Sequence, residues 1–114
     1  MARYICHFLI EASPASIKQP LREIMQSCSM EMIYEIEDYL MAREIPGEVS
    51  FSKLVTAEVL IDTTTATESR VKISFVVKND VLPLKVNNHC QQIFGQIKLT
   101  ISKNYKWQQI ESIF

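Results

Sequence analysis

The clearest hydrophobic pattern lies between Leu54 and Lys78, where two alternating apolar runs flank a polar loop at residues 63–68. Successive side chains of a strand point to opposite faces, so each run predicts a strand buried on one side. The two strands with the polar loop between them predict an antiparallel hairpin. The apolar positions that alternate are Val55, Ala57, Val59 and Ile61 in the first run, and Val71, Ile73, Phe75 and Val77 in the second.

The N-terminal segment predicts a strand followed by a helix. Residues 3–11 alternate with one fully apolar face and one mixed face, which favours a strand. Ser13 can cap the following helix, and Pro14 suits its first position. Apolar residues then recur at helical spacing as far as Cys28. Pro20 lies inside that pattern, so we expect a kink there or a helix whose regular part begins at Pro20.

Residues 30–45 fit two structures. As a strand, the segment places one apolar set on a single face, whereas helical spacing clusters a different set. We favour a hairpin with its turn at Glu37-Asp38, because four strands shield two helices better than two strands would. The strand set is Met30, Met32, Tyr34 and Ile36, and the helical set is Ile33, Ile36, Glu37, Leu40 and Met41.

The last predicted element is a helix that begins near Asn88. Gln91 follows Asn88 by three residues, as in a capping box, and apolar residues continue at helical spacing to Ile101. Beyond Tyr105 the phase shifts, and a new apolar row appears that either folds back as a helix or contacts a partner. That row consists of Trp107, Ile110 and Phe114.

Together these elements predict a single α+β domain over residues 1–114. We expect an antiparallel sheet of about four or five strands, in the order β-α-β-β-β-β-α, with two helices packed on one face. A chain of 114 residues is long enough for one hydrophobic core.

Composition excludes several classes of function. Apolar residues make up 47% and charged residues 22% of the chain, and its net charge of −1 gives no basis for binding nucleic acid or an anionic membrane. No apolar run approaches the roughly 18 residues of a membrane span. Two glycines are too few for a phosphate-binding loop. Three scattered cysteines do not suggest a disulfide framework, so we expect a reducing, cytoplasmic location.

Candidate chemistry is sparse, and we expect no catalytic residue, metal ligand or cofactor. The dipeptides Cys6-His7 and His89-Cys90 suggest metal or thiol chemistry, but neighbouring residues diverge on a strand and on a helix. The third cysteine, Cys28, has no flanking signature of a catalytic thiol. The densest acidic cluster is expected to line a solvated face. Its members are Glu31, Glu35, Glu37, Asp38 and Glu44.

Two resemblances follow from particular strings. Residues 39–47, 54–62, 75–79 and 87–90 resemble a family of small uncharacterised cyanobacterial proteins, which implies a cytoplasmic bacterial protein and no particular activity. Residues 10–17, Ile-Glu-Ala-Ser-Pro-Ala-Ser-Ile, are similar to the opening strand and helix of helix-grip (Bet v 1/START-like) domains. That second resemblance implies a final helix closing a ligand cavity over a curved sheet, although this chain has fewer predicted strands.

One anomaly suggests a function. Four apolar residues lie on strand faces that the predicted helices leave uncovered, and neighbouring residues of this kind mark interaction surfaces. We therefore predict a non-enzymatic interaction or adaptor domain that self-associates or binds a protein partner. The predicted interface is Ile5, Leu9, Leu60, Val76, Trp107, Ile110 and Phe114. The alternative is an apolar-ligand carrier, and a thiol or metal enzyme is a distant third. The expected cavity lining is Phe8, Met25, Met41, Phe75, Phe94 and Ile97.

Overall fold

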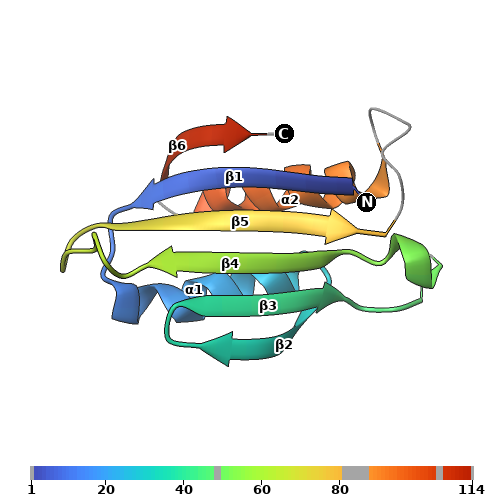
Figure 1. The fold of residues 1–114 in the computed structure, drawn as a ribbon, viewed down its shortest axis with the longest axis horizontal. Coiled ribbons are helices and arrows are strands. Elements are labelled where there is room, and N and C mark those ends of the chain that lie inside the picture. The colour runs from blue at the N-terminus through green and yellow to red at the C-terminus, as the bar shows by residue number, and fades with distance from the viewer. Residues whose placement is uncertain (1, 48–49, 81–87, 105–106, 114) are drawn as a thin grey trace.

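The structure, a computed structural model, describes residues 2–47, 50–80, 88–104 and 107–113. Figure 1 shows one antiparallel sheet of six strands in the order β2-β3-β4-β5-β1-β6. Along the described chain the elements are β1 (Ala2–Ile10), α1 (Pro14–Ser27), β2 (Met30–Ile36), β3 (Tyr39–Glu44), the short 3₁₀ helix η1 (Phe51–Lys53), β4 (Thr56–Asp62), β5 (Val71–Asn79), α2 (His89–Asn104) and β6 (Trp107–Ile113).

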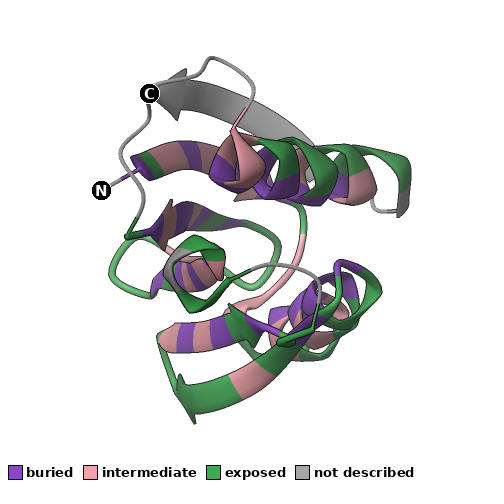
Figure 2. Cartoon of the chain, turned by 90° about the vertical axis from the view of Figure 1, so that its right-hand side faces the viewer, coloured by how far each residue is buried: buried purple, intermediate pink, exposed green. Residues whose placement is uncertain are grey.

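Both helices cover the same face of the sheet, as the edge-on view in Figure 2 shows. Large apolar side chains fill the core between the helices and the sheet. The rings of Phe8 and Phe75 pack edge to face there, with centroids 5.8 Å apart. The predicted α+β class, antiparallel sheet and two helices on one face are therefore confirmed. The largest fully buried side chains are Phe8, Phe75, Ile10, Ile17, Leu21, Ile24, Met25, Met30, Leu40, Ile73, Ile97 and Ile101.

The helix starts follow the capping residues found in the sequence. The Ser13 hydroxyl accepts a hydrogen bond from the backbone N–H of Ser16, and α1 begins at Pro14 rather than at Pro20. Pro20 lies inside the helix, where it can donate no backbone hydrogen bond. At the second helix, the Asn88 side-chain oxygen accepts from the N–H of Gln91 at 2.9 Å.

Residues 30–44 form the predicted hairpin, with the turn at Glu37-Asp38. The prediction that Met30, Met32, Tyr34 and Ile36 share one face of the first strand is correct only for Met30 and Met32. A bulge between Met32 and Tyr34 inserts one extra residue, so Met32 stands opposite buried Ala42, whereas Tyr34 stands opposite Met41. The bulge therefore moves the second half of β2, which includes Ile36, to the face without helices.

The segment after α2 is a strand and not a helix folding back on the core. β6 pairs antiparallel with β1, so that Trp107 stands opposite Ile10, and the sheet gains a strand that the predicted order lacked. Pairing with an available edge satisfies the backbone hydrogen bonds of this segment, although the spacing of its predicted apolar row is helical. In the parts of the chain that the structure describes, neither helix combines the length and apolar character needed to cross a bilayer.

Candidate interaction surface

The sheet has a second face on which, among the described residues, no helix or strand lies; it is turned toward the viewer in Figure 1. We call it the open face. Strand register defines its side chains, because residues that pair directly across a sheet share a face. Its described members are Glu31, Tyr34 and Ile36 from β2, Tyr39, Met41 and Arg43 from β3, Thr56, Glu58, Leu60 and Asp62 from β4, Lys72, Ser74, Val76 and Lys78 from β5, and Arg3, Ile5, His7 and Leu9 from β1.

Apolar residues occupy the middle of the open face. Val76 stands directly opposite Ile5 and is only 7% exposed, although no helix or strand in the described part of the chain lies over it. Leu60 stands directly opposite Tyr39 and is 44% exposed. Tyr34 and Tyr39 lie with ring centroids 6.1 Å apart, which extends the apolar area toward the edge of the sheet.

A polar network crosses this apolar area. The Glu58 carboxylate on β4 forms an ion pair with Lys78 on β5 and accepts a hydrogen bond from the Tyr39 hydroxyl. Burial and this hydrogen bond raise the pKa of Tyr39 to about 12. Burial would raise the pKa of Glu58, but the Lys78 and Tyr39 hydrogen bonds and nearby positive charges hold it below its ordinary value. The carboxylate therefore stays ionised between apolar neighbours, with Met41 opposite it on β3 and Val76 opposite it on β5.

The structure brings together only part of the predicted interface. Ile5, Leu9, Leu60 and Val76 share the open face as expected, and Ile5 contacts Val76 in register. Leu60 and Leu9 are separated by the His7–Ser74 hydrogen bond, 2.7 Å from Nδ1 to Oγ. The remaining three predicted residues lie in or after β6: for Trp107 and Ile110 only the strand is described, and Phe114 lies outside the described residues.

Sequence reasoning missed several members of this surface. Tyr34 and Ile36 lie on the open face only because of the bulge in β2, which no local sequence pattern predicts. Met41, expected to line a cavity, lies on the open face opposite Glu58 instead. Tyr39 and Met41 could have been placed from the hairpin turn at Glu37-Asp38, because that turn fixes which face each residue takes.

The edge of the sheet at β2 is protected against pairing with another strand. The Lys18 ammonium donates to the Ile36 carbonyl at 2.9 Å, and Arg22 holds the Glu35 carboxylate through two hydrogen bonds of 2.7 Å. Charged side chains and bulges are devices that natural sheets use to block edge-to-edge association. Glu35 thus lies beside α1 and does not simply line a solvated face as expected.

The thiols of Cys6 and Cys90 are not activated as nucleophiles. Cys6 and Cys90 are fully buried, and burial raises the pKa of Cys6 to about 12 and of Cys90 to about 11. His7 points to the opposite face from Cys6, where it bonds Ser74. In the described part of the chain, no three His, Cys, Asp or Glu side chains gather closely enough to hold a metal ion.

His89 pairs instead with a buried carboxylate. Its Nε2 lies 2.8 and 2.9 Å from the two carboxylate oxygens of Glu44, at the end of β3. Glu44 also accepts the backbone N–H of Val55 at 3.1 Å, so this carboxylate joins β3, the start of β4 and the first turn of α2. Glu44 was expected on the solvated face, and that expectation is wrong, since it is 6% exposed. The pair therefore ties β3 to the first turn of α2.

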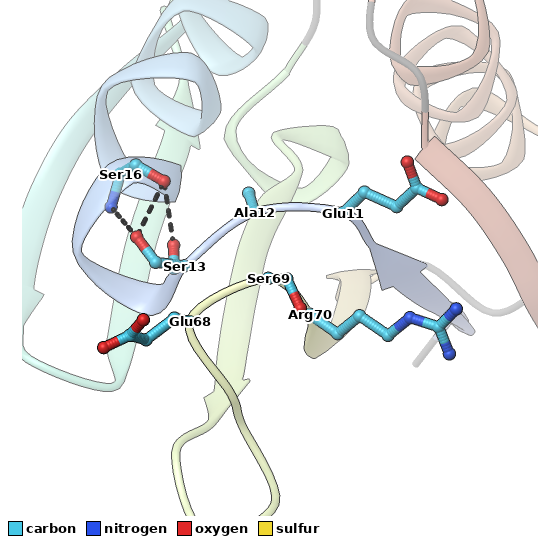
Figure 3. A pocket seen from close by; sticks show the side chains of 7 residues that line it. All are labelled: Glu11, Ala12, Ser13, Ser16, Glu68, Ser69 and Arg70. Carbon is cyan, nitrogen blue, oxygen red and sulfur yellow. Dashed lines mark hydrogen bonds between the residues drawn. The ribbon is translucent and has the colours of Figure 1, made fainter.

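A shallow depression of about 620 Å3 lies at the N-terminal end of α1, between the β1–α1 turn and the loop before β5 (Figure 3). Ser13 and Ser16 at its wall hydrogen-bond to each other at 3.0 Å. Figure 3 shows Glu68 and Arg70 pointing away from one another. Its polar groups therefore do not converge on a common point, as those of a ligand site do.

Comparisons with known proteins give no function. No protein-family model and no curated protein matches the chain. Among solved structures, a conserved protein from Geobacillus kaustophilus is similar at 13% identity and a TM-score of 0.38, over 94% of this chain and 99% of that one. A likeness at this level assigns neither family nor activity.

Proposed function

We propose that this domain is a non-enzymatic interaction module that forms a homodimer through the open face of its sheet. The observation that carries the proposal is the direct pairing of Ile5 with Val76 and of Leu60 with Tyr39 on a face that none of the described helices or strands covers. Domains bury the apolar face of a sheet against a second layer, and here a second copy supplies that layer. The three cysteines Cys6, Cys28 and Cys90 are free thiols, which suits a cytoplasmic location.

The size of the open face suits a dimer. With the five strands that contribute its described members about 4.8 Å apart, and about seven residues of about 3.3 Å each, its flat footprint is roughly 550 Å2. Stable interfaces bury about 800 Å2 of accessible surface per partner, and protruding side chains add to the flat area. Two such faces would pack about 10 Å apart, like the sheets of a sandwich.

The test is the oligomeric state of matched variants. Leu60→Lys places a charge on the open face, whereas Leu99→Lys places the same charge on α2 at a residue of similar exposure (44% and 55%). We expect light scattering after size exclusion to give a dimer for the wild type and for Leu99→Lys, and a monomer for Leu60→Lys with an unchanged far-UV circular dichroism spectrum. A monomeric wild type at high micromolar concentration would refute the proposal.

A further inference from the structure

Exposed apolar side chains gather in one half of the open face. Ile36 on β2 stands opposite Tyr39 on β3, and Tyr39 stands opposite Leu60 on β4, so these three residues form one row across the strands. Tyr34 and Met41 form the neighbouring row, two residues further along β2 and β3. We call these five residues the tyrosine patch. None of them carries a charge, and Tyr34, Ile36 and Leu60 are between 44% and 53% exposed.

The other half of the open face, on β1 and β5, offers less apolar surface among its described residues. Val76 is already covered by its neighbours within the single chain, so a partner would remove almost no further area from water there. The row beside it is polar, with His7 hydrogen-bonded to Ser74, and in the next row Lys72 stands opposite Leu9. Hydrophobic stabilisation is roughly proportional to the apolar area removed from water. The gain from self-association therefore comes mainly from the tyrosine patch.

We infer that the two-fold axis of the homodimer passes over β3, so that the tyrosine patch of each copy packs on the tyrosine patch of the other. This inference rests on the proposed homodimer and specifies which part of the open face holds it together. In a two-fold interface, a patch that contacts its own copy lies on the axis. β3 is the middle one of the three strands that carry the patch, so Tyr39 and Met41 lie against the same two residues of the second copy.

The chemistry of the patch suits a second copy of itself. The rings of Tyr34 and Tyr39 lie 6.1 Å apart within one chain, and two such pairs can form a cluster of four rings across the axis. Tyrosine is enriched among the residues that dominate the binding energy of protein interfaces. Glu58, opposite Met41, already has its ion pair with Lys78 and its hydrogen bond from Tyr39, so it requires no partner from the second copy.

Serine substitutions in the two halves of the open face test this inference. Ile36→Ser removes apolar area from the tyrosine patch, Leu9→Ser removes it from the other half, and Leu99→Ser on α2 is the control outside the open face. We expect sedimentation equilibrium to give a dissociation constant about tenfold higher for Ile36→Ser, about threefold higher or less for Leu9→Ser, and unchanged for Leu99→Ser. An effect of Leu9→Ser that equals or exceeds that of Ile36→Ser would overturn the inference and leave the homodimer intact.

Cross-linking locates the axis without removing apolar area from the patch. Two facing sheets lie about 10 Å apart, which is too far for a direct disulfide but within reach of a short bismaleimide. This reagent should link the two chains of a Met41→Cys dimer, whereas Leu9→Cys, three strands away from β3, should stay unlinked. The native thiols of Cys6, Cys28 and Cys90 are buried and do not compete for the reagent.

The outcomes separate the inference from the homodimer on which it rests. Linkage of a Leu9→Cys dimer, or none of a Met41→Cys dimer, would show that the axis does not pass over β3. A wild-type chain that stays monomeric would instead refute the homodimer itself, and the placement of its axis with it.

Discussion

The buried carboxylate of Glu44 provides a quantitative test of the packing between the sheet and α2. Its side chain is 7% exposed, and it accepts hydrogen bonds from two donors, the backbone N–H of Val55 and Nε2 of His89. Glu44→Leu leaves both donors without their acceptor. Val55 is fully buried, so water cannot replace the lost bond there, whereas the imidazole is 24% exposed and can reach solvent.

The expected cost comes mainly from the orphaned Val55 N–H. An unsatisfied buried donor costs about 1–3 kcal/mol, so Glu44→Leu should lower the free energy of unfolding by about 2–3 kcal/mol. For a domain of this size, that corresponds to a fall of about 10 °C in Tm. Glu44→Gln keeps an acceptor oxygen in the same place and should cost about 1 kcal/mol.

The coupling between Glu44 and His89 can be measured by a double-mutant cycle. His89→Leu removes one partner of the buried carboxylate, which leaves its charge less compensated and should cost about 2 kcal/mol. In the double variant neither side chain of the pair is left without its partner, so its stability should be no lower than that of the weaker single variant. Urea denaturation followed by circular dichroism measures all four proteins. Simple addition of the two single effects, or a Glu44→Leu protein as stable as the wild type, would show that the pair is not buried as described.

Three further predictions follow from particular residues. Pro20→Ala restores a backbone donor inside α1 and should raise the free energy of unfolding by about 1 kcal/mol or more, as measured by urea denaturation. The pKa of Glu58 is lowered in the fold, so the ionised carboxylate stabilises the protein above the unfolded-state pKa of 4.5, and this stabilisation is lost as the pH falls through the folded-state pKa. Thermal unfolding should therefore show a shallower loss of Tm between pH 5 and about pH 3 for Glu58→Gln than for the wild type. The raised pKa values of Cys6 and Cys90 predict that iodoacetamide at pH 8 labels neither thiol until guanidinium unfolds the chain, as mass spectrometry can check.

The elements of the fold were predictable because their signals are local. Alternation in β4 and β5, the Ser13 cap and the Asn88–Gln91 spacing each depend on a few neighbouring residues, and each element formed where expected. The strand after α2 was not predictable, because its pairing with β1 joins opposite ends of the chain.

The side of the sheet that each residue occupies was predictable only where the register is uninterrupted. The four apolar residues of the predicted interface in β1, β4 and β5, including Leu60 and Val76, lie on the open face as their alternation requires. The bulge in β2 shifts Tyr34 and Ile36 by one position and changes their face, and nothing in the local sequence separates this from a regular strand. Glu44 could not be recognised as buried, because its partner His89 comes from a distant helix.

The place of β1 in the sheet has a consequence for biosynthesis. Among the described strands β1 is the first to be translated, yet its neighbours are β5 and β6, which come after at least three other strands and one α-helix. The hairpins β2–β3 and β4–β5 can form as soon as they emerge, whereas an apolar β1 must wait for β5. A stalled translating complex from which Asn79 has emerged should therefore hold a protease-resistant sheet that already includes residues 2–10, and one stalled before Val71 emerges should leave that segment open to chaperones.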